Sequence, residues 1–178
     1  MNYEEAHIIM KENLKNRNLR SHSYAVESAM RAYARKFGDD EEKWAAAGIL
    51  HDFDYEKWPE EHPTRGKDLL EEMNVPEEIV QAIQEHGEIP AESKMGKALK
   101  AVDRLSGLIV ACALVRPDKK LQSVEVKSVL KKMKDKSFAA QIDRDDLRKC
   151  SDDLGVPFEE HVDIVLVSMK NISDKLGL

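Results

Sequence analysis

The chain has 178 residues, 28 Lys and Arg against 34 Asp and Glu, and a formal net charge of -6, a size that suits one domain with its own core. Its 42% apolar and 35% charged residues argue against extended disorder, and the acidic excess argues against general nucleic-acid binding. No apolar run approaches the ~20 residues of a membrane span, the first residues lack a secretory signal pattern, and the isolated Cys112 and Cys150 fit a reducing compartment, so we expect a cytoplasmic protein.

The hydrophobic periodicity is helical nearly throughout, and no alternating strand of useful length occurs. The sequence therefore predicts an all-α fold whose helix ends are marked by caps, prolines and glycines. In chain order, the predicted helices cover 3–15, a segment capped by Ser21 and ending at Gly38, a segment capped by Asp39 or Asp40 and ending at His51, then 63–73 with Pro63 in the first turn, 76–87, 93–115, a segment from Ser123 to about 133, 143–154, and 157–176.

No linker divides the chain, so we predict a single domain over 1–178, with the weakest joint around 116–122. Apolar residues at helical spacing in 123–178 predict a C-terminal helical extension that completes the core or forms one wall of a pocket. A homodimer formed through the last helix is an open alternative.

Charge is unevenly distributed along the chain. Residues 51–90 contain three basic and twelve acidic residues, whereas residues 91–140 contain twelve basic and five acidic residues. This pattern is typical of solvated helix surfaces. It is also what a metal site beside a phosphate-attracting patch would show, and both interpretations stay open at this point.

Ionisable residues lie on the apolar faces of four predicted helices. His22, His51, His86 and Asp103 each have apolar neighbours at spacings of three or four residues. A buried carboxylate is costly unless it is paired or bound to a metal, and histidine with carboxylate is a ligand set for zinc, iron or manganese. A lone buried histidine is usually a hydrogen-bonded core residue, but this set favours a metal site.

The dipeptide His51-Asp52 has a structural requirement of its own. Neighbours on a helix diverge by about 100°, so both side chains can reach one ion only near a helix end. The following segment, residues 53–59 with the sequence FDYEKWP, is consistent with such an end.

With these residues, the sequence resembles the HD-domain metal-dependent phosphohydrolase superfamily over about residues 15–115. The family pattern is a His, then His-Asp, then a distant Asp, and His22, His51-Asp52 and Asp103 match it in order. A two-metal subgroup adds two histidines. His62 in HPTRG and His86 in QEHG match these. No Gly-Tyr-Pro follows His86, so the chain departs from the cyclic-di-nucleotide phosphodiesterase branch and is similar to a branch of predicted HD-superfamily hydrolases.

The resemblance implies an all-α, HD-domain-like helical bundle with additional C-terminal helices, and it implies bound divalent metal. Two ions are expected, with iron or manganese favoured and zinc, nickel or magnesium as alternatives. The implied ligands are His22, His51, Asp52 and Asp103 for one ion, and His62 and His86 for the other, with Asp52 bridging the two.

The resemblance further implies a hydrolase in which a metal-activated water attacks a phosphate ester or anhydride of a nucleotide or another small phosphorylated metabolite. Asp52 and Asp54 are the predicted catalytic carboxylates. Asp54 would be a proton donor, an outer partner of a ligating histidine, or only a loop acid. Arg65, Lys97 and Lys100 are candidate phosphate contacts, with Lys97 also a candidate catalytic residue; ordinary surface charges are the alternative.

Two other functional classes fit the same residues. The ligand order also resembles HD-fold di-iron oxygenases that use O2, and a metal-bound sensing or interaction module without catalysis stays open. Phosphate-binding loops, dinucleotide-binding glycine motifs and a nucleophile elbow are all missing from the sequence. The resemblance implies a small phosphorylated substrate, possibly a nucleotide, as the partner, and we expect no membrane association.

Overall fold

Helices build the fold, as the periodicity predicted. The computed structural model describes residues 1–87 and 89–178, and no strand occurs among them. None of the described helices is both long and apolar enough to cross a membrane. The helices are α1 (Tyr3–Asn13), α2 (Arg17–Phe37), α3 (Glu41–Leu50), α4 (Thr64–Glu72), α5 (Glu77–Glu85), α6 (Lys94–Leu114), α7 (Val126–Lys132), α8 (Arg144–Leu154), α9 (Phe158–Asn171) and α10 (Ser173–Leu176).

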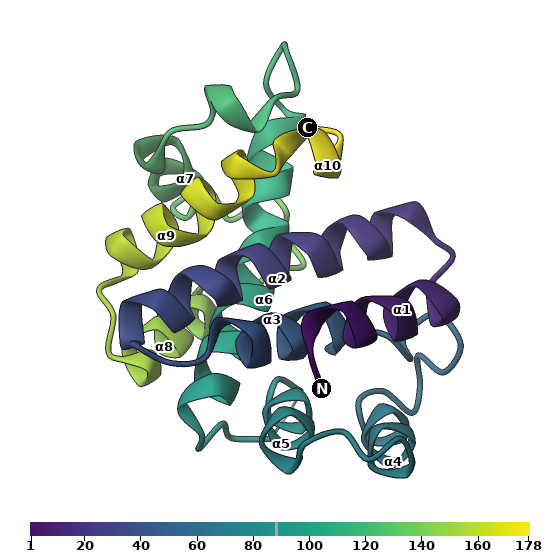
Figure 1. Ribbon diagram of the computed structural model, residues 1–178. Coiled ribbons are helices and arrows are strands. Elements are labelled where there is room, and N and C mark those ends of the chain that lie inside the picture. Colours follow the sequence, from purple (N-terminus) through teal and green to yellow (C-terminus); the bar gives the residue numbers. More distant parts are fainter. Residues whose placement is uncertain (88) are drawn as a thin grey trace.

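Helix α6 is the central element of the fold. It packs against α2, α3 and α5 on one part of its length and against α7, α8 and α9 on others. Figure 1 shows α2 crossing in front of α6, with α4 and α5 at one end of the molecule and α7 and α10 at the other. This arrangement brings the N-terminal part of α2, the end of α3, the end of α5 and the middle of α6 towards one another.

The crossing of α2 and α3 depends on a glycine. A Cβ atom added to Gly48 would lie 2.8 Å from the Cα atom of Glu27, a distance that real Cβ atoms essentially never show. The preceding residues Ala45, Ala46 and Ala47 are also small and buried. Small side chains therefore allow the two backbones to approach closely. This approach places His51, which directly follows α3, beside His22 of α2.

Several predicted helix ends are confirmed by their capping geometry. Gly38 ends α2 with φ of 72°, Asp40 caps α3 through the backbone amides of Glu42 and Lys43, and Ser93 caps α6. Pro63 was expected inside the first turn of its helix, but it occupies the position just before α4.

Two predicted helix starts are wrong. Helix α2 begins at Arg17 and not at Ser21. The Asn16 side chain accepts hydrogen bonds from the backbone amides of Asn18 and Leu19 and so caps the helix. Ser123 does not start α7; it ends a 3-10 turn, where its hydroxyl donates to Asp118, and α7 begins at Val126.

The last predicted helix is also interrupted. The segment expected as one helix over 157–176 divides at Ile172 into α9 and α10. Ile172 has φ of -121°, outside the helical range, and separates the two helices. The short α10 therefore folds back against α2 instead of extending α9.

The C-terminal helices join the core through a buried histidine. The Tyr33 hydroxyl lies 2.6 Å from His161 Nδ1, and His161 Nε2 lies 3.1 Å from the Ala101 carbonyl oxygen. Because a carbonyl can only accept, Nε2 carries the proton and Nδ1 accepts from the tyrosine. His161 of α9 therefore links α2 to α6 in its neutral form.

This histidine predicts a pH-dependent contribution to stability. Burial lowers the pKa of His161 to about 4, against about 6.5 in an unfolded chain. Between these values the unfolded state binds more protons, so the free energy of unfolding falls as the pH falls. We expect wild type to lose about 2 kcal/mol more than His161→Gln between pH 6.5 and pH 5, measured by urea unfolding. Equal pH dependence in the two proteins would contradict this assignment.

Candidate metal centre

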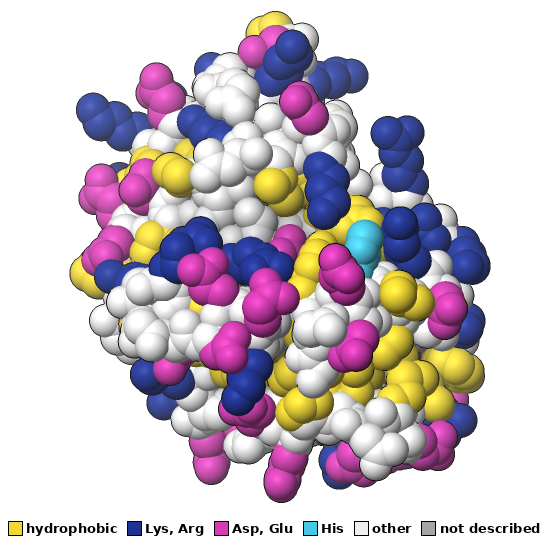
Figure 2. Space-filling model, in the orientation of Figure 1, with side chains coloured by type: hydrophobic (Ala, Val, Ile, Leu, Met, Phe, Trp, Pro, Cys, Tyr) yellow, Lys and Arg dark blue, Asp and Glu magenta, His cyan; other side chains and the backbone are white. Residues whose placement is uncertain are grey.

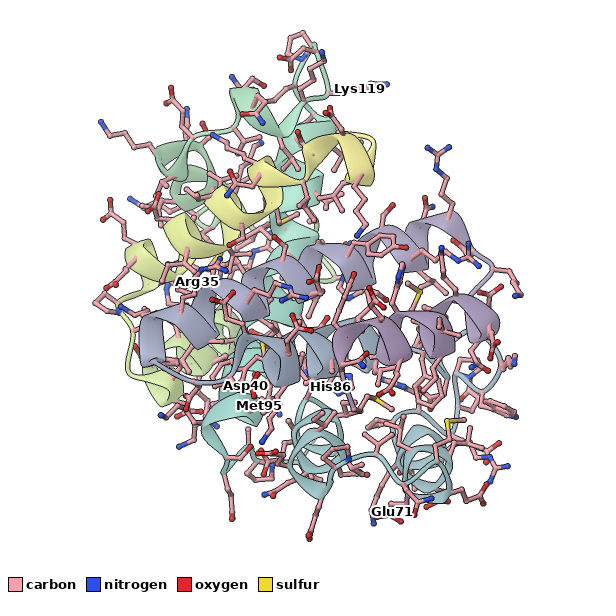
Figure 3. All side chains as sticks on the ribbon, viewed as in Figure 1. Arg35, Asp40, Glu71, His86, Met95 and Lys119 are labelled. Carbon is pink, nitrogen blue, oxygen red and sulfur yellow. The ribbon has the colours of Figure 1, made fainter. Side chains whose placement is uncertain are left out.

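All six predicted metal ligands converge at one place in the fold. His22 lies in α2, His51 and Asp52 directly follow the last residue of α3, and Asp103 lies in α6. His62 precedes α4 and His86 directly follows α5. In Figure 3, His86 lies between α5 and the helices above it, whereas Glu71 and Lys119 lie at the periphery of the molecule.

The first group of donor atoms consists of His22, His51 and Asp103. His22 Nε2 lies 2.9 Å from Asp103 Oδ1 and 3.1 Å from His51 Nε2, and His51 Nε2 lies 3.7 Å from Asp103 Oδ1. Around an ion with bonds of ~2.1 Å, adjacent donors stand about 3.0–3.4 Å apart. The donor types and their spacing therefore fit a divalent ion.

The second group consists of Asp52, His62 and His86. Asp52 Oδ1 lies 3.2 Å from His62 Nε2 and 3.6 Å from His86 Nε2, and the two histidine nitrogens are 3.2 Å apart. The other oxygen of the same carboxylate, Oδ2, lies 3.3 Å from His51 Nε2 and 3.6 Å from His22 Nε2. Asp52 thus presents one oxygen to each group, which is the arrangement of a bridging carboxylate.

The Nδ1 atom of each histidine has a partner outside the centre, which leaves Nε2 pointing inward. Such outer partners fix the ring orientation of a metal-binding histidine and its tautomer. The partners are the Gly48 carbonyl for His51 at 2.8 Å, the Ile83 carbonyl for His86, the Ser106 hydroxyl for His22 at 3.3 Å, and Asp54 Oδ1 for His62 at 2.7 Å.

Two of these partners come from helix ends. His51 and His86 each follow the last residue of a helix and bond to a carbonyl three residues earlier. The last carbonyls of a helix have no intrahelical donor, so each ring satisfies one of them. The expected helix end at His51-Asp52 is confirmed, and it explains how adjacent side chains reach the same centre.

Electrostatics in the centre favour charged side chains. Burial opposes a charge on His51, but the neighbouring Asp52 and Asp103 carboxylates outweigh it and raise the pKa of His51 to about 9. Burial also opposes a charge on His62, and Asp52 and Asp54 raise its pKa to about 9. Although burial disfavours its charge too, the histidines hold the pKa of Asp52 well below its usual range. Metal must therefore displace protons from the histidines when it binds.

Asp54 lies behind His62, and only 1% of its surface is exposed. Asp54 lies in the loop between α3 and α4, and its burial there suits an outer partner of His62. Its Oδ1 atom accepts a hydrogen bond from His62 Nδ1, and its Oδ2 atom has no hydrogen-bond partner among the described residues. A Cβ added to Gly66 would lie 2.8 Å from the Asp54 carboxylate. Gly66, part of the HPTRG segment but without a predicted role of its own, therefore provides the space that Asp54 occupies.

Removing Asp54 should weaken metal binding at the second group. In Asp54→Ala, His62 loses the acceptor that orients its ring. We therefore expect the affinity of the second donor group for Mn(II) to fall by roughly 10–100-fold. Asp68→Ala, which removes an exposed carboxylate on α4, is the matched control. Titration calorimetry measures both. Unchanged affinity in Asp54→Ala would show that Asp54 does not position His62.

The three predicted phosphate contacts lie outside both donor groups. The Arg65 guanidinium lies over the Trp58 ring, 5.6 Å from its centroid. Lys100 Nζ donates to the carbonyls of Gly87 and Ile89 at 2.7 and 2.8 Å. Lys97 and Lys100 line a groove of about 620 Å³ between α6 and α8, whose lining includes none of the six ligands. Their roles towards phosphate stay predictions.

Comparison with known proteins gives one family. The profile of the HD domain matches residues 19–108, which is half of the chain and contains all six residues of the two donor groups. No curated protein and no solved structure matches the chain. HD domains are all-α and are mostly metal-dependent phosphohydrolases, in agreement with the helices and the paired histidine and aspartate groups seen here. The chain therefore belongs to the HD-domain family.

Proposed function

We propose that the protein is a metal-dependent phosphohydrolase that holds two divalent ions, iron or manganese, in the two donor groups. The observation that supports this most strongly is the placement of Asp52, with one oxygen 3.2 Å from His62 Nε2 and the other 3.3 Å from His51 Nε2. Mixed histidine and carboxylate donors suit iron and manganese better than magnesium, which prefers oxygen ligands.

When bound, such ions supply hydroxide at neutral pH and stabilise charge on phosphate oxygens. The side chains of this chain would hold the ions and keep their ligands in position. Asp52 joins the two groups, and Asp54 keeps the His62 ring in place. In the proposed hydrolysis, a water oxygen bonds to phosphorus, the bond from phosphorus to the leaving oxygen breaks, and the leaving oxygen takes a proton.

The proposed substrate is a phosphate ester or anhydride of a small metabolite, nucleotides included. Lys97, Lys100 and Arg65 remain candidates for contacts with substrate phosphates, because cationic donors bind phosphate oxygens strongly. We also propose a cytoplasmic location, which suits the two buried free thiols of Cys112 and Cys150.

Release of phosphate in the absence of O2 tests this proposal. We expect the protein loaded with Mn(II) to release inorganic phosphate from at least one member of a phosphate-ester panel in oxygen-free buffer. Turnover that requires both Fe(II) and O2 would support an oxygenase instead. Absence of turnover across the panel with Mn(II) and Fe(II) would support a metal-bound sensing module.

A further inference from the structure

A cavity of about 600 Å³ opens beside His22, between α2, α6 and α10. His22 is the one residue of the two donor groups in its lining. The size lies within the range of small-molecule pockets, about 300–1,000 Å³. Since His22 belongs both to the cavity lining and to the metal centre, a molecule in the cavity would lie against one of the six predicted ligands.

Two of the predicted metal ligands, His22 and Asp103, are partly exposed to solvent. The side chains of His22 and Asp103 are 27% and 23% exposed, whereas that of His51 is fully buried. Ser106, which bonds to His22 Nδ1, precedes Gly107 of the cavity lining. The cavity therefore lies next to the two most exposed ligands, with His22 in its lining and Gly107 one helical turn from Asp103.

The wall formed by α6 is apolar. Gly107, Val110 and Leu114 recur at helical spacing and all line the cavity, and Leu114 is 49% exposed. Leu176 of α10 also lines it. Figure 2 shows a face on which Lys and Arg side chains are interspersed with Asp and Glu side chains, and hydrophobic side chains gather towards its lower right. An apolar stripe beside polar metal ligands is a different environment, and apolar walls with a few polar groups are typical of ligand pockets.

We propose that this cavity binds the uncharged, largely apolar organic part of a phosphate ester whose phosphate lies at the metal centre. The inference rests on the proposed function and adds the substrate class. A small molecule is favoured as the occupant because His22 of the metal centre lines the cavity. Arg17 also lines it, and its positive charge favours a phosphate ester over an uncharged molecule.

Gly107 sets the space available in this cavity. Among the described residues, a Cβ added there would meet no atom within 4 Å, so a larger side chain can enter the cavity. Gly107→Leu therefore narrows the pocket without replacing any of the six predicted metal ligands. Val115→Leu, at the residue that directly follows α6 and outside the cavity lining, is the control.

The experiment compares 1-naphthyl phosphate with glycerol 2-phosphate on the full chain loaded with Mn(II). We expect wild type to prefer 1-naphthyl phosphate, and the ratio of kcat/KM values for the two esters to fall at least ~10-fold in Gly107→Leu, because a filled apolar pocket discriminates by steric exclusion. The ratio in Val115→Leu should match wild type. Thermal unfolding checks that both variants are folded.

A binding measurement separates this inference from the proposed function. Naphthyl fluorescence reports binding of 1-naphthylmethylphosphonate, which cannot be hydrolysed as an ester. Binding lost in Gly107→Leu supports the cavity even if no phosphate is released, in which case the proposed hydrolysis fails and the site stands. Phosphate release with an unchanged ester ratio in Gly107→Leu overturns the inference and leaves the hydrolase intact. A dimer in light scattering that Gly107→Leu dissociates would also overturn it, by showing that a second copy covers the apolar stripe.

Discussion

Asp52→Ala is expected to abolish the proposed hydrolysis and to remove at least one of the two proposed ions. Asp52 is the side chain that faces both donor groups, through Oδ1 to His62 and His86 and through Oδ2 to His22 and His51. Without it, the second group retains two histidines, too few to hold a divalent ion firmly. We expect the rate of phosphate release to fall at least ~1,000-fold, since the charge stabilisation by paired ions is lost.

The control for this prediction is Asp68→Ala, an exposed carboxylate on α4. It should keep both its metal and its activity, because it lies outside the two donor groups. Elemental analysis and a phosphate-release assay on the same preparations give the two quantities. Full metal occupancy in Asp52→Ala would contradict the bridging role of its carboxylate.

Gly48→Ala should destabilise the protein strongly, whereas Gly107→Ala should not. A Cβ at Gly48 would lie 2.8 Å from the Glu27 backbone, but one at Gly107 would meet nothing within 4 Å. Overpacking of this kind costs about 1–3 kcal/mol, while replacing an unconstrained helical glycine gains up to about 1 kcal/mol. The free energies of unfolding of the two variants should therefore differ by about 1–4 kcal/mol.

Urea unfolding of metal-depleted protein measures this difference without a contribution from the bound metal. Gly48→Ala should also bind Mn(II) more weakly, because the displaced α3 carries His51 away from His22. Equal stability of the two glycine variants would show that the crossing of α2 and α3 does not depend on the small residue.

The helices and the convergence of the ligands could be predicted from the sequence for identifiable reasons. Histidines and an aspartate on apolar helical faces must point into the fold, and caps such as Asp40 and Ser93 mark helix starts through local hydrogen bonds. The resemblance to the HD-domain pattern then supplied their grouping. These signals are either local or carried by residue identity, so the sequence contains them.

What could not be predicted depends on contacts across the fold. Gly66 and Gly48 are important because of the atoms opposite them, Asp54 and Glu27, and neither pairing has a signature in the sequence. Asn16 and Ser21 are both acceptable helix caps, and the choice between them follows from the folded chain. The cavity beside His22 likewise requires α10 to turn back against α2, which the expected continuous last helix did not allow.

The metal content of the purified protein tests the central claim most directly. Protein prepared without chelators and reconstituted with Mn(II) should contain two ions per chain by elemental analysis, and His86→Ala should contain one, because it removes a ligand of the second group alone. A wild-type protein that binds no divalent ion, or two ions retained in His86→Ala, would contradict a two-metal centre built from these six side chains.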